Sequence, residues 1–153
     1  MEIKYLKQLK DNPNLKSWTS IRGWELSKIE ALETKYNKGR KFPLAFREYL
    51  FLAGDFGGTG MVNEDWDDLH ADCQEDLNYF GYRVQRPYFV FDNYDSQYKI
   101  FYLDEELEDP KIFILDPYGK NRGEFDLVRP AFINTFSKLI NEAIYRIKND
   151  IPF

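Results

Sequence analysis

Residues 88–115 read YFVFDNYDSQYKIFYLDEELEDPKIFIL, and this stretch decides the fold because the apolar segments within it have a period of two. Phe, Tyr, Val and Ile favour pleated strands. We expect strands at residues 88–91, 98–103 and 111–115, with a turn over 93–96. Strands that follow one another through short connections pair antiparallel, so the sequence predicts a meander.

The chain after this stretch returns to helical spacing. We expect a turn from Asp116 to Gly119 and a fourth strand over residues 124–128. A long helix is expected after Pro130, because apolar residues then recur every three or four positions. Its predicted buried side carries Phe132, Phe136, Leu139, Ile140, Ala143, Ile144 and Ile147.

Two helices are expected within residues 27–54. Ser27 and Glu30 have the spacing of a capping box, which predicts where the first one begins. Gly39 is its expected end. Pro43 suits the first turn of the next helix, which is expected to end at Gly54.

A glycine-rich loop over residues 54–60 leads into a third, acidic helix. This helix is expected to stop at Gly81, and its acids lie on faces away from the apolar stripe. The apolar stripe contains Trp66, Leu69, Cys73, Leu77 and Phe80.

Residues 1–24 are expected to be an arm made of a short helix and irregular chain. Asn12 and Pro13 stop the helix, and Trp18 is expected to dock on the body. No linker divides the chain, so we expect a single domain over residues 1–153. The pattern of helices, then strands, then a helix predicts an α+β fold. We expect an antiparallel sheet of about four or more strands with helices packed mainly on one face.

The composition is that of an ordinary globular protein, with 153 residues, 43% hydrophobic and 31% charged. These values argue against disordered and collagen-like classes. The apolar runs are too short for a membrane span, and no leader peptide is apparent at Met1. With Cys73 as the one cysteine, no internal disulfide is expected, and a reducing cytoplasm is the expected location.

The charge is unevenly distributed. Residues 48–82 contain no Lys or Arg and have a net charge of −9. The net charge of the whole chain is −5, so the remaining residues have a net charge of +4. This block would repel phosphates, which argues against nucleic-acid binding and favours a basic partner. Its acids are Glu48, Asp55, Glu64, Asp65, Asp67, Asp68, Asp72, Glu75 and Asp76.

No catalytic, metal or cofactor site is expected. His70 and Cys73 could form a base and nucleophile, but Cys73 falls on the apolar stripe and is expected to fill the core. Zinc sites usually need three or four Cys or His ligands, and the chain has two such residues. A calcium loop starting at Asn63 fails, because its sixth position is Asp68 and not glycine. The glycine loop lacks the Lys-Ser/Thr of a phosphate-binding loop.

The acidic helix permits two interpretations. Charge runs often form a solvated helix face. Large aromatic rings among acids without basic neighbours are also typical of a binding surface. If it is a binding surface, the electrostatic set is Asp65, Asp67, Asp68, Asp72, Glu75 and Asp76, with Trp66 and Tyr79 as candidate anchors.

Two short motifs resemble the opening of the SUKH superfamily, the Smi/Knr-like domains. The first contains Ile29, Leu32, Glu33 and Tyr36. The second contains Phe42, Pro43, Phe46, Arg47 and Leu50, followed by Gly54. The strand pair around Leu103 to Leu115 and the last helix are also similar, so the resemblance covers about residues 27–147. Phe42 stands where the family usually has Leu, and Ala53 where it has Asn.

The resemblance implies a non-catalytic binding domain. Bacterial members are mostly immunity proteins that bind and neutralise a cognate toxin, often a nuclease or deaminase, and fungal members are regulatory scaffolds. We therefore expect an immunity protein with a basic toxin as partner and with no nucleic-acid or membrane partner. The sequence leaves the oligomeric state open. Two alternatives remain open: a small hydrolase that uses carboxylates not yet identified, and a housekeeping protein-interaction module.

Overall fold

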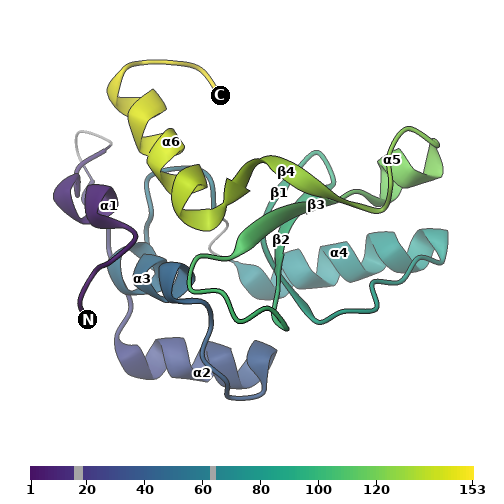
Figure 1. Ribbon diagram of the computed structural model, residues 1–153, viewed down its shortest axis with the longest axis horizontal. Helices are drawn as coiled ribbons and strands as arrows, with labels where there is room; N and C mark the ends of the chain where they lie inside the picture. The colour runs from purple at the N-terminus through teal and green to yellow at the C-terminus, as the bar shows by residue number, and fades with distance from the viewer. Residues whose placement is uncertain (16–18, 63–64) are drawn as a thin grey trace.

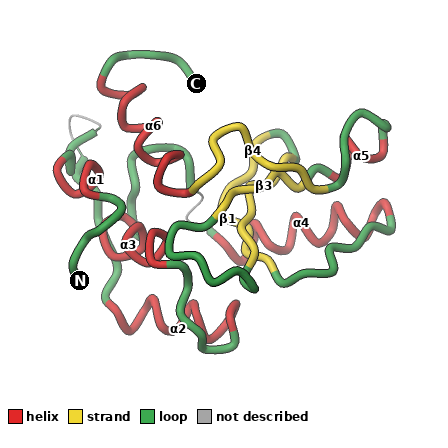
Figure 2. Tube along the Cα trace, in the orientation of Figure 1, coloured by secondary structure: helices red, strands yellow, loops and turns green. Residues whose placement is uncertain are grey.

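The computed structural model describes residues 1–15, 19–62 and 65–153 (Figure 1). Trp18, Asn63 and Glu64, named above, lie outside these residues. Within them, the strands form one antiparallel sheet in the order β1-β2-β3-β4, so each strand pairs with the next along the chain (Figure 2). The predicted α+β class is confirmed. The strands are β1 Tyr88–Tyr94, β2 Gln97–Tyr102, β3 Lys111–Leu115 and β4 Val128–Thr135.

In Figure 1, α1, α2 and α3 lie to the left of the sheet, whereas α4 runs below the sheet and extends to the right. No helix in the described part of the chain has the length and apolar character needed to cross a bilayer. The helices are α1 Lys7–Asp11, α2 Leu26–Asn37, α3 Leu44–Ala53, α4 Trp66–Phe80, α5 Pro117–Asn121 and α6 Phe136–Lys148.

Aromatic rings fill the space between the sheet and helices α3 and α6. The ring centre of Phe46 in α3 lies 5.1 Å from that of Phe89 and 5.2 Å from that of Phe101. Phe136, the first residue of α6, lies 5.4 Å from Phe91 by the same measure. All five side chains are completely buried. Each therefore contributes roughly 1.5–3 kcal/mol of hydrophobic stabilisation.

Helix α4 covers a different side of the sheet. Phe89 and Val90 are neighbours on β1, and neighbouring strand residues point to opposite faces, yet both are fully buried. Val90 pairs with Ile100, which shares a face with Tyr98. Tyr98 is bonded to Asp76 of α4. Helices α3 and α6 thus cover one face of the sheet, and α4 covers the other face at β1 and β2.

Strand β4 corrects two predictions. The fourth strand is not at residues 124–128, and the last helix does not follow Pro130. The chain stays extended from Val128 to Thr135, and α6 begins at Phe136. Partly buried and exposed side chains alternate along β4, and Phe132 is fully exposed instead of buried. Pro130 is tolerated because β4 is an edge strand.

Two local predictions are also wrong. Helix α2 begins at Leu26 after the N-cap Glu25, with no side-chain cap, so Ser27 does not form a capping box. The predicted turn from Asp116 to Gly119 is the start of α5. There the Asp116 carboxylate accepts a 2.8 Å hydrogen bond from the Gly119 N–H, and Pro117 occupies the first turn.

The β1–β2 turn is tighter than expected. The strands continue to Tyr94 and from Gln97, so the turn contains Asp95 and Ser96 alone, both with positive φ angles of 50° and 59°. This is the backbone of a two-residue hairpin that matches the twist of the strands.

Candidate partner-binding surface

Four exposed residues form one stripe along α4. Asp68, Asp72, Glu75 and Tyr79 follow one another at spacings of four, three and four, which places them on a single helix face. All four are exposed, and Tyr79 keeps 79% of its surface open to solvent. We call Asp68, Asp72 and Glu75 the acidic stripe. The sequence-predicted acids that face solvent together therefore run from the first turn of the helix to its middle.

The start of α4 concentrates negative charge further. Asp65 is the N-cap, and its Oδ1 accepts a 3.2 Å hydrogen bond from the Asp68 N–H. An Asp at this position stabilises the helix by about 0.5–2 kcal/mol relative to Ala. Asp65, followed by Asp72 and Asp67, raises the pKa of Asp68, because like charges disfavour its ionised form. A cation placed here would relieve that repulsion.

Two acids of the predicted set instead connect α4 to the rest of the protein. Asp67 forms a 2.6 Å ion pair with Lys35 of α2 and accepts a hydrogen bond from the Tyr36 hydroxyl. These two hydrogen bonds lower the pKa of Asp67, with Lys35 the larger cause. Asp76 accepts a 2.5 Å bond from the Tyr98 hydroxyl. Asp67 and Asp76 thus have structural partners, and the acidic stripe lies between them.

Trp66 cannot be a surface anchor. Only 3% of its surface is exposed, and its ring lies 5.2 Å from Trp24 and 6.0 Å from Phe46, centre to centre. The first residue of α4 therefore packs into the core. We remove Trp66 from the candidate surface because a buried ring cannot contact a partner.

An aromatic cluster continues the stripe at the C-terminal end of α4. The ring centre of Phe80 lies 4.9 Å from that of Tyr79, 4.9 Å from that of Tyr118 and 5.8 Å from that of Tyr82. The Tyr118 hydroxyl also lies 3.3 Å from Asp76 Oδ1. Asp76, with smaller effects from Tyr79 and Glu75, raises the pKa of Tyr118. We call Tyr79, Phe80, Tyr82 and Tyr118 the aromatic end.

Sequence reasoning missed half of the aromatic end. Phe80 was assigned to the buried stripe, and Tyr118 to an isolated turn. Helix α5 brings Tyr118 against α4 across a separation of nearly forty residues, which no local pattern reveals. The signal that could have indicated this cluster is the run of large rings around Gly81, where α4 ends. Tyr79, Phe80 and Tyr82 are so close in sequence that they cannot all lie on one buried face of the helix.

The remaining acids of the block have other roles. Glu48 is fully buried in α3, and its carboxylate accepts hydrogen bonds of 2.7, 2.9 and 2.9 Å from the N–H groups of Lys4, Tyr5 and Leu6. It thereby holds the N-terminal arm in place just before α1. Asp55 forms a 2.9 Å ion pair with Arg22. The negative charge available to a partner is therefore that of α4.

His70 and Cys73 are both engaged in packing α4 against β1. The His70 Nε2 accepts a 3.0 Å hydrogen bond from the Val90 N–H, and its Nδ1 lies 2.7 Å from the Trp66 carbonyl oxygen, to which it donates. Burial raises the pKa of the Cys73 thiol to about 12. Because both ring nitrogens of His70 are occupied, this arrangement holds a neutral imidazole and an un-ionised thiol.

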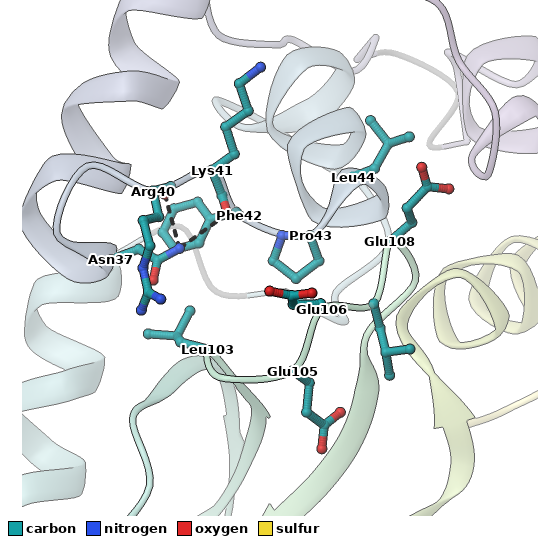
Figure 3. A pocket seen from close by; sticks show the side chains of 11 residues that line it. Asn37, Arg40, Lys41, Phe42, Pro43, Leu44, Leu103, Glu105, Glu106 and Glu108 are labelled. Atoms are coloured by element: carbon teal, nitrogen blue, oxygen red, sulfur yellow. Dashed lines mark hydrogen bonds between the residues drawn. The ribbon is translucent and has the colours of Figure 1, made fainter.

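A separate hollow of about 340 Å³ lies between residues 40–44 and the β2–β3 connection (Figure 3). Three glutamates border it, but their carboxylates diverge. Glu105 forms a 3.1 Å ion pair with Arg86, and Glu108 a 2.6 Å ion pair with Lys4. In the described residues, no three His, Cys, Asp or Glu side chains are grouped to hold a metal ion. The hollow therefore has no converging set of polar groups.

We compared the chain with protein-family models, with curated proteins and with solved structures, and none matched.

Proposed function

We propose that the protein is a non-catalytic immunity protein that binds and neutralises a toxin domain through α4. The observation that carries the proposal is the exposed acidic stripe that ends in the aromatic end. The resemblance to the SUKH superfamily supports the same class. Cytoplasmic location is part of the proposal, because an immunity protein must meet the toxin where the toxin acts.

The stripe fits a basic partner for a physical reason. A toxin that acts on nucleic acid presents Lys and Arg that would otherwise bind phosphates, and carboxylates can take the place of those phosphates. Helix α4 has no Lys or Arg of its own, so its carboxylates have no internal i,i+4 partner along the stripe. A basic surface would remove the mutual repulsion that raises the pKa of Asp68.

The aromatic end supplies the second element of an interface. Tyr and Trp carry much of the binding energy at protein interfaces, usually near the centre of the contact. Tyr79 is 79% exposed and Tyr118 is 38% exposed, next to Glu75 and Asp76. Guanidinium groups stack on such rings while they pair with carboxylates. The chemistry of the surface therefore suits arginine-rich segments.

The test begins with the neighbouring reading frame, which the proposal expects to encode a secreted protein that ends in a toxin domain, and then measures protection of cells that express this domain. We expect co-expression of this protein to restore growth, and purified protein to inhibit the toxin in a one-to-one complex. A folded protein that neither binds that domain nor protects would contradict the proposal.

A further inference from the structure

A second surface, formed by β4 and α6 and not by α4, has an exposed aromatic ring at a groove. Phe132 of β4 is fully exposed, which is unusual for a phenylalanine on a strand. A groove of about 600 Å³ adjoins it between β4 and α6. Ile133 and Tyr145 form part of its wall, and Tyr145 is itself 55% exposed. The exposed Phe132 ring and the groove therefore lie on the same face of the protein.

One wall of the groove belongs to the edge strand β4. Strand β4 is the last in the order and pairs with β3 alone, so its outer backbone edge has no strand beside it in the described residues. The pairing with β3 is irregular between Lys111 and Phe113, and Pro130 has no N–H to donate. A strand of a partner could therefore form only a few backbone hydrogen bonds with β4. Side-chain burial must supply most of any contact with a partner.

We propose that a second copy of this chain occupies the groove, with Phe132 of each copy seated in the groove of the other. A two-fold interface is self-complementary, so the same patch must provide both the projecting group and its socket. Phe132 stands on one wall of the groove, and in the dimer it would contact Ile133 and Tyr145 of the other copy. This inference does not depend on the proposed function.

Charge favours a copy over a strongly charged partner. Lys138 and Glu142 border the groove one helical turn apart, and Glu142 forms a 2.8 Å ion pair with Arg146. Both signs are present, so two copies meet without net repulsion, and Lys138 of one can face Glu142 of the other. The acidic stripe on α4 could not pair with itself, because only like charges would meet there.

The expected contact is of modest size. A standard interface buries about 800 Å² on each partner. A fully buried aromatic side chain buries roughly 150–250 Å², so Phe132 can supply part of that area and the exposed half of Tyr145 a smaller part. The groove walls and the edge of β4 would supply the rest. The dimer should therefore dissociate on dilution instead of being obligate.

Sedimentation equilibrium over a wide range of protein concentration tests the proposal. We expect the wild type to form dimers that dissociate on dilution. Phe132→Ser and Tyr145→Ser should each weaken dimerisation at least tenfold. The matched control is Tyr94→Ser, which removes a ring that is 76% exposed at the end of β1 and should leave dimerisation unchanged.

Hydrogen exchange gives a readout that needs no variant. Residues 128–135 should exchange more slowly in concentrated than in dilute wild-type protein, while α4 should exchange alike in both. A wild type that stays monomeric up to hundreds of micromolar would overturn the inference. So would a dimer that both Phe132→Ser and Tyr145→Ser leave intact, or one that protects α4 and not β4.

Discussion

The Tyr98 hydroxyl donates a 2.5 Å hydrogen bond to the Asp76 carboxylate, and this bond fastens α4 to strand β2. Tyr98 is 1% exposed, so the bond is shielded from water at its strand end. The acidic stripe lies on the outward side of the same helix. This bond, together with the 3.0 Å hydrogen bond from the Val90 N–H of β1 to His70, therefore helps to fix the position of the candidate surface.

Removing the hydroxyl should destabilise the fold. Hydrogen bonds to charged groups contribute about 1.5–3 kcal/mol. We expect Tyr98→Phe to lower the free energy of unfolding by roughly that amount at neutral pH, measured by urea denaturation. Tyr94→Phe is the control, because Tyr94 is 76% exposed. Equal unfolding midpoints for Tyr98→Phe and wild type would show that the bond contributes nothing.

Stability should depend on pH through His70. Burial lowers the pKa of His70 in the folded protein, whereas the unfolded side chain titrates near ~6.5. The unfolded chain therefore binds more protons as the pH falls below ~6.5, and the stability that His70 contributes above this value is lost progressively. His70→Gln can still accept the bond from the Val90 N–H but does not titrate. We expect it to flatten the fall in unfolding free energy between neutral and mildly acidic pH, and parallel curves for the two proteins would contradict this.

The two phenylalanines at the β4–α6 junction should respond in opposite ways to the same change. Phe136 is fully buried, so Phe136→Asp places an unpaired charge in the core and should unfold the protein. Phe132 is fully exposed, so Phe132→Asp should leave circular dichroism and the melting temperature of the monomer nearly unchanged. A cooperatively folded Phe136→Asp protein would contradict the assignment of α6 to the core.

The Cys73 thiol should be protected in the folded state. Burial raises its pKa to about 12, so almost none is thiolate at neutral pH. A thiol-reactive disulfide reagent should label the protein only after urea unfolding. Fast labelling of the native protein, at a rate close to that of the unfolded chain, would show that Cys73 is exposed and open the question of a reactive role.

Local patterns predicted the elements whose signals lie within the element itself. Helix α4 combines a regular apolar stripe with a glycine stop at Gly81, whose φ is 72°, and β3 has a clean run of strand formers. The prediction for the β4–α6 junction was wrong because Phe132 and Phe136 also have helical spacing. Pairing with β3, which is a tertiary contact, keeps residues 128–135 extended.

In the candidate surface, too, some features follow from local sequence and others depend on tertiary contacts. The exposure of Asp68, Asp72 and Glu75 follows from helical geometry and could be predicted. The structural use of Asp67 depends on Lys35, which lies thirty-two positions earlier, so no spacing rule indicates it. The sequence allowed Trp66 to be either part of the buried apolar stripe or a surface anchor. Its contact with Trp24 shows that it belongs to the core.

The most direct test of the central claim measures how this protein associates, across a salt series, with the toxin domain that the proposed function expects in the neighbouring reading frame. Asp72→Lys combined with Glu75→Lys reverses two exposed acids of the stripe. Glu30→Lys with Glu106→Lys makes the same change in net charge elsewhere on the surface. We predict that the stripe variant binds at least tenfold more weakly, about 1.4 kcal/mol, and that the control binds nearly as tightly as wild type. Wild-type association should slow as salt shortens the Debye length towards ~8 Å, and the stripe variant should lose most of that dependence. Equal affinity and equal salt dependence for the stripe variant and wild type would contradict the claim that α4 binds the partner.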